Sequence, residues 1–275
     1  MSPAAQERSN ERYRIRSVER ALSILQLFAA EKGELSASEI SRKLGLPQST
    51  AFRLLVTLAA SGFVEQNPEN DRYRLGVGCL ALGSTFLANS DLRQRSIPYL
   101  ERLRDETGET VHLGILDGYD VVYLDQLPGL HPIGLMSSKV GAHAPSYCTG
   151  LGKALLAFLP EEQINAYIQK VTLVPFTPNT ITNPSELLSE LSRVCEQGYS
   201  FDNEEHEQGV GCIAAPVFDH KGVVAAISIA GPAERIIAGR AGDSEGRLVQ
   251  LVTQTAAEIS VQLGAKSASR VRQSG

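Results

Sequence analysis

The sequence contains no tryptophan, two methionines and four cysteines among its 275 residues, and it has no long apolar run. Its longest apolar stretches, Val223 to Ile227 and Ala154 to Leu159, are far shorter than the roughly 20 residues that cross a bilayer. No apolar stretch follows the charged N-terminal residues, so we expect no secretory signal. The cysteines form no Cys-x-x-Cys pair, which argues against a disulfide framework or a zinc site and favours free thiols in the cytoplasm.

The charge of the chain is unevenly distributed. The formal net charge is −5, yet residues 1–90 carry 11 Lys and Arg against 9 Asp and Glu, whereas residues 91–275 carry 15 against 22. Five arginines in the first 20 residues form a basic arm on an otherwise acidic protein. Such an arm fits contact with nucleic acid, although a solvated tail without function would look the same. With 43% hydrophobic residues, the chain is long enough for two modest domains with buried cores.

Three helices are predicted near the N-terminus. Over Ser17–Ala30 the apolar residues recur at three- and four-residue steps, as on one face of an amphipathic helix. Ser36, followed three positions later by Glu39, indicates a capping box, and Gly45 marks the end of this second helix. Pro47 suits the first turn of a third helix that carries its own apolar stripe.

The second and third helices, joined by Gly-Leu-Pro, have the dimensions of a helix-turn-helix, whose second helix lies in the major groove of DNA. Strand-like runs at 63–66 and 72–75 flank a turn-rich segment and predict the hairpin of a winged helix. A three-helix interaction module with a solvated hairpin is the alternative. The residues predicted to contact DNA are polar or basic: Arg14, Arg16, Ser36, Gln48, Ser49, Thr50, Arg53, Arg72 and Arg74.

The rest of the chain predicts a linker helix and then an α+β domain, in which an antiparallel sheet carries helices on its faces. Pro98 lies within the helix expected over 92–107 and predicts a kink or a split there. Strands are predicted over 110–116, 121–127, 133–136, 210–218 and 223–230, and further helices over 149–158, 161–171, 185–197 and 244–263.

A glycine-rich segment opens the helix predicted from Thr149, where backbone N–H groups favour an anion. A phosphate-binding loop is excluded, because Tyr147 and Ala154 occupy the positions where it needs a glycine and a hydroxyl residue. A small carboxylate is physically suitable. The stretch from Asp202 to His206 is unusually polar for the approach to a buried strand, although such a stretch is more often a solvated loop.

Cysteine catalysis is the main rival hypothesis. Cys148 or Cys212 would need a histidine as base, and no motif selects a pair; the candidate bases are His143, His206 and His220. A buried cysteine is usually a small, inert apolar residue. Scattered His and Cys without metal-ligand spacing give no support to zinc. We therefore expect neither a catalytic residue, nor a cofactor, nor a metal.

Three separated stretches of the sequence resemble the IclR family of bacterial transcriptional regulators. The N-terminal domain of that family resembles RSVERALSILQLF followed by LSASEISRKLGLPQSTAFRLLVTLAASGFVEQNPENDRYRLG. The two signature stretches of its effector-binding domain resemble APSYCTGLGKALLAFLP and GYSFDNEEHEQGVGCIAAPVFDHKGVVAAISIAGP. The resemblance covers roughly residues 14 to 263 of this chain.

This resemblance implies a winged helix-turn-helix over 14–76, a linker helix over 77–90 and a GAF-like effector-binding domain over 91–265, between a flexible arm (1–13) and a flexible tail (266–275). Leu151 and Ala230 depart from smaller or hydroxyl-bearing residues that are common in the family. The positions that match the family's effector cavity are Ile133, Met136, Ala144, Gly150, Leu151, Asp202, Val210, Cys212 and Ser228.

The resulting expectation is a cytoplasmic regulator that is not an enzyme. It binds a palindromic operator as a homodimer or homotetramer, because one recognition helix reads only a few base pairs. Repression is the family default, and we expect repression of a catabolic operon, modulated by a small organic acid in the C-terminal domain. An activator, or an effector domain that retains hydrolase-like cysteine chemistry, is the alternative.

Overall fold

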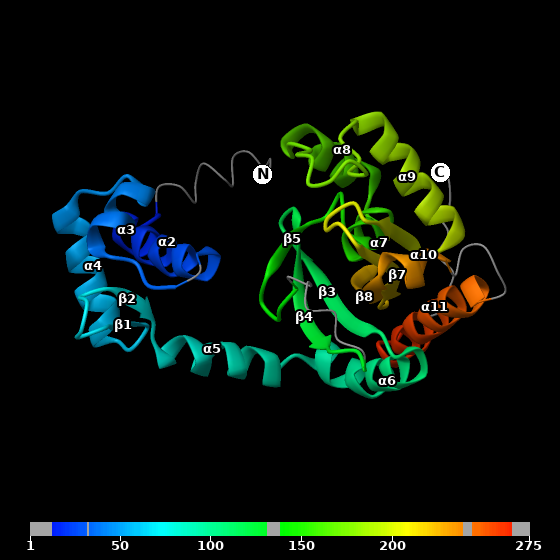
Figure 1. The fold of residues 1–275 in the computed structure, drawn as a ribbon, viewed down its shortest axis with the longest axis horizontal. Helices are drawn as coiled ribbons and strands as arrows, with labels where there is room; N and C mark the ends of the chain where they lie inside the picture. Colours follow the sequence, from blue (N-terminus) through cyan, green and yellow to red (C-terminus); the bar gives the residue numbers. More distant parts are fainter. Residues whose placement is uncertain (1–12, 32, 131–137, 239–243, 266–275) are drawn as a thin grey trace. The chain divides into compact units, whose positions relative to one another are not determined.

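The computed structural model describes residues 13–31, 33–130, 138–238 and 244–265. The chain folds into two compact units, Met1–Asn89 and Ser90–Gly275 (Figure 1). The predicted strand over 133–136, the tail over 266–275 and all of the N-terminal arm except Tyr13 lie outside the described residues.

The first unit is a small helical domain with a hairpin. Its core is built from buried apolar side chains of all its helices except the last, including Ile24, Ile40 and Leu55, together with Tyr73 of the hairpin. The two strands of the hairpin pair antiparallel. Its elements are α2 (Arg16–Ala30), α3 (Ala37–Leu44), α4 (Gln48–Ala60), β1 (Val64–Gln66), β2 (Tyr73–Leu75) and α5 (Val77–Ala88).

Local capping signals set the ends of α3. The Ser36 hydroxyl accepts a hydrogen bond from the backbone N–H of Glu39, and the Glu39 carboxylate accepts one from the Ser36 N–H at 2.7 Å. Gly45, with a φ of 63°, adopts the left-handed conformation that ends many helices and costs glycine little. The capping box and the glycine stop predicted from the sequence are confirmed.

The second unit is built on one antiparallel sheet with the strand order β5-β4-β3-β8-β7-β6. The central strands β8 and β7 are almost entirely buried, as expected for a sheet that is covered on both faces. The strands are β3 (Thr110–Asp117), β4 (Asp120–Leu127), β5 (His143–Pro145), β6 (Ser200–Asn203), β7 (Val210–Phe218) and β8 (Val223–Pro232).

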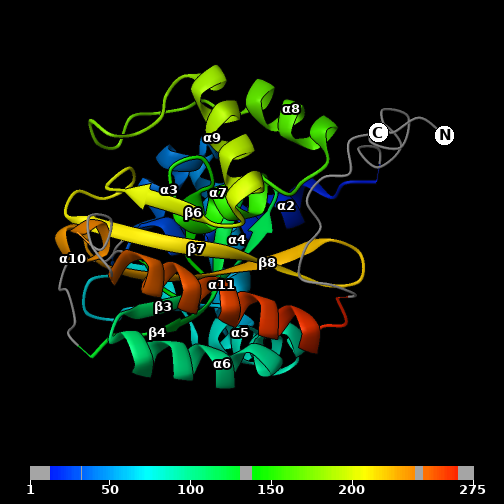
Figure 2. The ribbon, with the colours of Figure 1, turned by 90° about the vertical axis from the view of Figure 1, so that its right-hand side faces the viewer.

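Helices cover both faces of this sheet, as Figure 2 shows. α6 (Asp91–Thr107) and α11 (Ser244–Gln262) pack on one face, and α7 (Gly150–Leu156) packs on the other. The helices α8 (Glu161–Lys170) and α9 (Pro184–Gln197) lie beyond α7, and the short α10 (Ala233–Ala238) follows β8. The predicted α+β architecture is confirmed.

One alternative predicted for the second unit is wrong, and three short elements were missed. Of the kink or split expected at Pro98, the split does not occur: α6 continues through Pro98, with a Ser90 cap, a left-handed Gly108 and the buried Leu100 and Leu103. A proline removes only one backbone donor, and burial of an apolar face outweighs that loss here. The short elements β5, β6 and α10 were not predicted, because they are too brief for hydrophobic periodicity to reveal them.

Candidate DNA-binding surface and effector cavity

The start of α4 presents a polar surface. Gln48 and Ser49 are exposed and Thr50 is half-buried, while Ala51 and Leu55 on the opposite side of the helix are buried in the core. Such a helix, anchored by one face with polar side chains at its N-terminal end, has the form of a recognition helix.

Arg53 lies one turn further along α4 and is exposed. It makes no ion pair with any residue that the structure describes, so its charge is available to a phosphate. Near the start of α2, Arg16 is exposed, whereas the Arg14 guanidinium pairs with Glu19 at 2.6 Å.

The two arginines of the hairpin are paired with acidic residues of the same unit. Arg72 donates to the Glu39 carboxylate and to the Glu34 backbone carbonyl, both at 2.8 Å. Arg74 lies 3.0 Å from the Glu65 carboxylate and 3.5 Å from that of Glu34. The sequence predicted that both side chains project the same way toward DNA, and it did not predict this pairing.

The same pairing affects the acidic partners and the cap. Hydrogen bonds from the Ser36 backbone and hydroxyl, assisted by Arg72, lower the pKa of Glu39 to about 2. Hydrogen bonds from Asn70 and Asn67, and the charges of the two hairpin arginines, also lower the pKa of Glu34. The Ser36 hydroxyl caps α3: it accepts a hydrogen bond from the Glu39 N–H and donates one to the Glu39 carboxylate. It would have to give up one of these hydrogen bonds to donate to a DNA phosphate.

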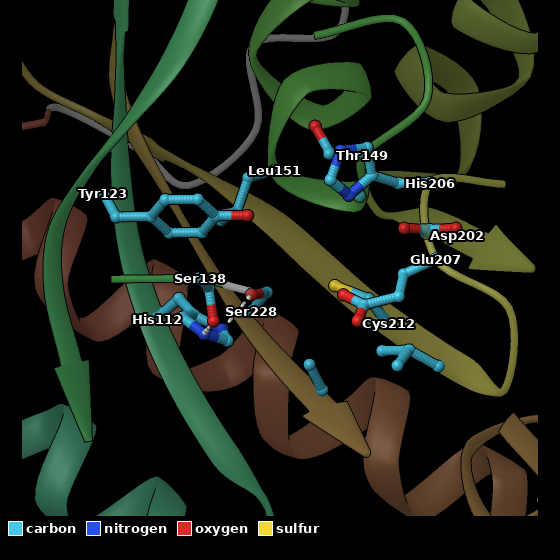
Figure 3. Close-up of a pocket in the computed structure, with 13 residues that line it drawn as sticks. His112, Tyr123, Ser138, Thr149, Leu151, Asp202, His206, Glu207, Cys212 and Ser228 are labelled. Carbon is cyan, nitrogen blue, oxygen red and sulfur yellow. Dashed lines mark hydrogen bonds between the residues drawn. The ribbon is translucent and has the colours of Figure 1, made fainter. Parts of the chain in front are cut away.

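The second unit contains a small, partly open cavity of about 50 Å³ between the sheet and the start of α7 (Figure 3). Of the positions predicted for effector binding, Gly150, Leu151, Asp202, Val210, Cys212 and Ser228 line it. The complete lining is His112, Tyr123, Ser138, Thr149, Gly150, Leu151, Asp202, His206, Glu207, Val210, Cys212, Ser228 and Ala230.

Three predicted positions are not part of this lining as described. Ala144 is buried in the edge strand β5, opposite Val121 of β4, and is not among the residues that line the cavity. Ile133 and Met136 lie outside the described residues.

Strand register explains which side chains meet. His112 of β3 is opposite Ser228 of β8, and Cys212 of β7 is opposite both Ala230 of β8 and Asp202 of β6. Since alternate residues of a strand point to the same face, these positions share one face of the sheet. Most of the side chains in these rows are small, which leaves the space that becomes the cavity.

Asp202 is the acidic group deepest in the site. Its carboxylate accepts a hydrogen bond from the Glu205 N–H at 2.8 Å. Burial raises the pKa of Asp202 to about 7, although the positive charge of Lys153 opposes the shift. Near neutral pH, Asp202 therefore exists in both forms and can donate a hydrogen bond as well as accept one.

Cys212 does not have the properties of a nucleophile. Its thiol is buried, and burial together with the nearby Asp202 raises its pKa to about 12. Burial also raises the pKa of Cys148. Because the thiolate is the reactive form, both cysteines are inert at neutral pH. The described residues also contain no group of three His, Cys, Asp or Glu side chains placed to hold a metal ion.

A buried ion cluster lies next to the cavity but does not line it. Lys153 of α7 donates to the Phe201 backbone carbonyl at 2.5 Å and contacts the carboxylates of Glu205 and Glu190. Among the described lining residues there is no lysine or arginine. A bound carboxylate would therefore be held by hydrogen-bond donors and not by a paired cation.

Several lining residues were missed from the sequence, above all His112, Tyr123 and Ser138. His112 is buried, and desolvation lowers its pKa to about 4, so the imidazole is neutral. A single histidine in an apolar strand gives no local signal, since the strand pairing that makes it part of the site is long-range.

Comparison with known proteins places both units. The model described as "IclR helix-turn-helix domain" matches residues 17–68, and "Bacterial transcriptional regulator IclR C-terminal" matches residues 84–261. The HTH-type transcriptional regulator XynR of Escherichia coli is 41% identical over 223 residues, covering 81% of this chain and 88% of XynR. The HTH-type transcriptional repressor AllR of Escherichia coli is 38% identical over 255 residues, 91% of each chain.

A solved structure is similar in both units. It is an IclR homologue from Microbacterium hydrocarbonoxydans in complex with 4-hydroxybenzoate, and it has a TM-score of 0.76 at 25% identity, covering 90% of this chain and 98% of that one. No helix among the described residues is both long and apolar enough to span a membrane.

Proposed function

Because this chain belongs to the IclR family of bacterial transcriptional regulators, we propose that it represses a catabolic operon and that a small organic acid modulates its binding to the operator. Family membership makes it a DNA-binding helix-turn-helix regulator and not an enzyme. The repressor role is supported by a relative named as a repressor. As a regulator of bacterial transcription, it would act in the cytoplasm.

The cavity of the second unit carries the effector part of the proposal. It combines apolar walls, including Leu151 and Val210, with polar groups on Asp202, Thr149 and Ser228. Such a mixture excludes water while fixing the orientation of a small ligand. The complex of a family member with 4-hydroxybenzoate, an organic acid, supports the same ligand class for this chain.

Calorimetry of the full chain against a panel of small organic acids tests the effector proposal. We expect one acid to bind, and we expect Asp202→Ala and Cys212→Trp to abolish that binding by removing a hydrogen-bonding group or filling the cavity. Asp105→Ala, which removes an exposed carboxylate on α6, is the matched control and should bind normally. Unchanged affinity in both cavity variants would place the site elsewhere.

For the DNA-binding part, we propose that α4 lies in the major groove of a palindromic operator, with Gln48, Ser49, Thr50 and Arg53 toward the DNA. The arm 1–13 and residues 14–76 would form the DNA-binding part, 77–90 the linker and 91–265 the effector domain, followed by the tail 266–275. Gln48→Ala should relax preference at particular base pairs, whereas Arg53→Ala should weaken binding to all sequences.

We further propose a homodimer or homotetramer. The helix α5 has no buried residue and exposes four large apolar side chains: Val77, Leu80, Leu82 and Phe86. A helix that is apolar on all sides gains free energy when another surface covers it, and a second copy would also supply the second recognition helix. Sedimentation of the wild type and of Phe86→Ser measures the oligomeric state. A wild-type protein that remains a monomer would contradict the proposal.

A further inference from the structure

One acidic residue, Glu34, connects the helical part of the winged unit to its hairpin. We call this hairpin, residues 64–75, the wing. Glu34 lies between α2 and α3, and its neighbour Leu35 pairs with Tyr73 of β2 through two backbone hydrogen bonds, of 2.8 and 2.9 Å. The segment that carries Glu34 therefore lies directly against the second strand of the wing.

The turn of the wing depends on two asparagine side chains. The Asn67 Oδ1 accepts a hydrogen bond from the Glu69 N–H at 3.0 Å, and the Asn70 Oδ1 accepts one from the Arg72 N–H at 2.9 Å. Asp71, within this turn, has a φ of 57°, in the left-handed region that residues other than glycine rarely adopt. Such a turn needs support from outside the wing, because an isolated two-stranded hairpin is at best marginally stable in water.

Glu34 supplies this support through the nitrogen atoms of the same two asparagines. The Asn67 Nδ2 donates to both carboxylate oxygens of Glu34, at 3.1 and 3.2 Å, and the Asn70 Nδ2 donates to one of them at 2.9 Å. Each asparagine therefore holds the turn with its oxygen and holds Glu34 with its nitrogen. The Glu34 side chain is only 21% exposed, so water has limited access to the oxygens that accept these bonds.

Glu34 also orients the two arginines of the wing. Its backbone carbonyl accepts two hydrogen bonds from the Arg72 guanidinium, at 2.8 and 3.1 Å, and its carboxylate lies 3.5 Å from the Arg74 Nη1. Arg72 extends further to the Glu39 carboxylate in the first turn of α3. These contacts attach the wing to the helix-turn-helix, so that the wing arginines and the start of α4 keep one relative position.

We propose that Glu34 is a positioning residue for DNA binding: it holds the wing in the conformation that meets the DNA backbone, although phosphate repels its own charge. The inference rests on the proposed role of residues 14–76 in DNA binding. A preorganised loop loses less conformational entropy on binding than a loose one. Removal of the Glu34 carboxylate therefore has two effects of opposite sign, since the loss of a negative charge favours DNA and the loss of the support opposes it.

The test measures the affinity of the full chain for a duplex that the wild type selects from a random-sequence pool, about 40 base pairs long to accommodate two half-sites. We expect Glu34→Ala to bind this duplex about tenfold more weakly than the wild type, because the lost support outweighs the lost repulsion. Glu69→Ala is the matched control. Glu69 is an exposed carboxylate of the same turn, and its side chain has no hydrogen-bond or ion-pair partner among the described residues. This variant loses the same charge without the support, so it should bind as tightly as the wild type or more tightly.

Two further measurements separate the support from the charge. In Glu34→Gln the side-chain oxygen can still accept from the asparagines, so this variant should recover most of the affinity that Glu34→Ala loses. Hydrogen–deuterium exchange of the free proteins should be faster over residues 66–75 in Glu34→Ala, and unchanged there in Glu69→Ala. Exchange in α4 should be the same in all variants, which shows that the helices remain folded.

Three results would each overturn the inference while leaving the DNA-binding role of residues 14–76 in place: undiminished affinity in Glu34→Ala, no recovery in Glu34→Gln, or unchanged exchange of the wing. If Glu34→Ala also loosens α4, Asn70→Ala decides, because it removes one hydrogen bond of the support from the wing side. Undiminished affinity in that variant would also overturn the inference. A wild type that selects no duplex would instead contradict the DNA-binding role itself.

Discussion

The second unit has a buried ion cluster, whereas the ion pairs described in the winged unit lie at its surface. In the winged unit, Arg72 and Arg74 pair with carboxylates at the surface, and their side chains are 37% and 51% exposed. In the second unit, the Lys153 side chain is 1% exposed and lies against Glu190 and Glu205, which are also buried. Surface pairs contribute little to stability, whereas a buried pair that loses one member leaves a charge in the interior.

This difference matches what each unit is proposed to bind. An exposed arginine can exchange its carboxylate partner for a DNA phosphate at a small cost in free energy. The affinity for DNA should therefore fall as the salt concentration rises. The buried charges of the second unit cannot exchange their partners in this way, because an unpaired charge in the interior is costly. Its response should depend on the fit of a ligand and on the protonation of buried groups such as Asp202 and His112.

The largest effect is expected from removing the buried ammonium. Lys153→Met leaves the buried Glu205 without its cation, whereas Glu190 keeps its pair with Arg193, and should lower the free energy of unfolding by about 3–5 kcal/mol. Urea unfolding of the full chain measures it. Lys221→Met, at an exposed position in the β7–β8 turn, is the control and should change little. A loss below about 1 kcal/mol would mean that the cluster is not a charged buried network.

The second prediction concerns pH. The pKa of Asp202 is raised to about 7, so the protonated form favours the folded state. This contribution is complete below the ordinary aspartate pKa of 3.8 and is lost as pH rises through about 7. The side chain in Asp202→Asn does not titrate, so the stability of this variant does not include this pH-dependent contribution. Between pH 5 and pH 8 the wild type should therefore lose about 2–4 kcal/mol more stability than the variant.

Unfolding curves of both proteins at these two pH values check the prediction. His206, whose pKa shift comes from burial and Glu207, contributes to both proteins and cancels in the difference. Parallel pH profiles for the wild type and Asp202→Asn would show that the Asp202 carboxylate is ionised throughout this range.

A smaller effect is expected in the winged unit. Ser36→Ala removes the hydroxyl that caps α3 and should cost about 1 kcal/mol of stability. Thermal unfolding measures the loss, and Ser17→Ala, at an exposed position in the first turn of α2, is the control. Acid binding should be the same in both variants. A parallel loss of acid affinity in Ser36→Ala would contradict the independence of the two units.

The smallest effect on stability, but a clear one on DNA, is expected at the hairpin. Arg74→Ala breaks only surface pairs, so unfolding should change little. Arg72→Ala also removes the hydrogen bonds to the Glu34 backbone carbonyl and should cost about 1 kcal/mol. If each arginine turns to a phosphate, each variant should reduce the salt dependence of DNA binding by about one unit of slope. Arg102→Ala breaks the exposed pair with Glu258 in the second unit and should leave the slope unchanged. Unaltered slopes in both hairpin variants would mean that these arginines remain with their carboxylates.

Local features of the fold were predictable from the sequence. The capping box at Ser36, the stop at Gly45 and the β7–β8 hairpin all arise from residues within a few positions of one another. The same holds for the glycine-rich start of α7, because a glycine-rich run before an apolar helix is a local signal.

Features that depend on long-range pairing were not predictable. His112 joins the cavity because β3 pairs with β8, which brings it to Ser228, 116 residues away in the chain. The hairpin arginines meet Glu34 and Glu39, which come from segments that no local pattern connects to the wing. Sequence periodicity indicates which face of a strand is buried, but it does not give the strand order that brings side chains together.

Operator binding by the full chain, measured with and without a bound acid, tests most directly whether the second unit controls the first. Coupling between a ligand site and a DNA site requires different ligand affinities in two states, and it typically changes affinity by about 5- to 150-fold. We predict a change of this size in the wild type. Asp202→Ala and Cys212→Trp should bind the operator as the wild type does without acid, and should not respond to acid. An unchanged response in both variants, or no response in wild-type protein that has bound the acid, would contradict the account.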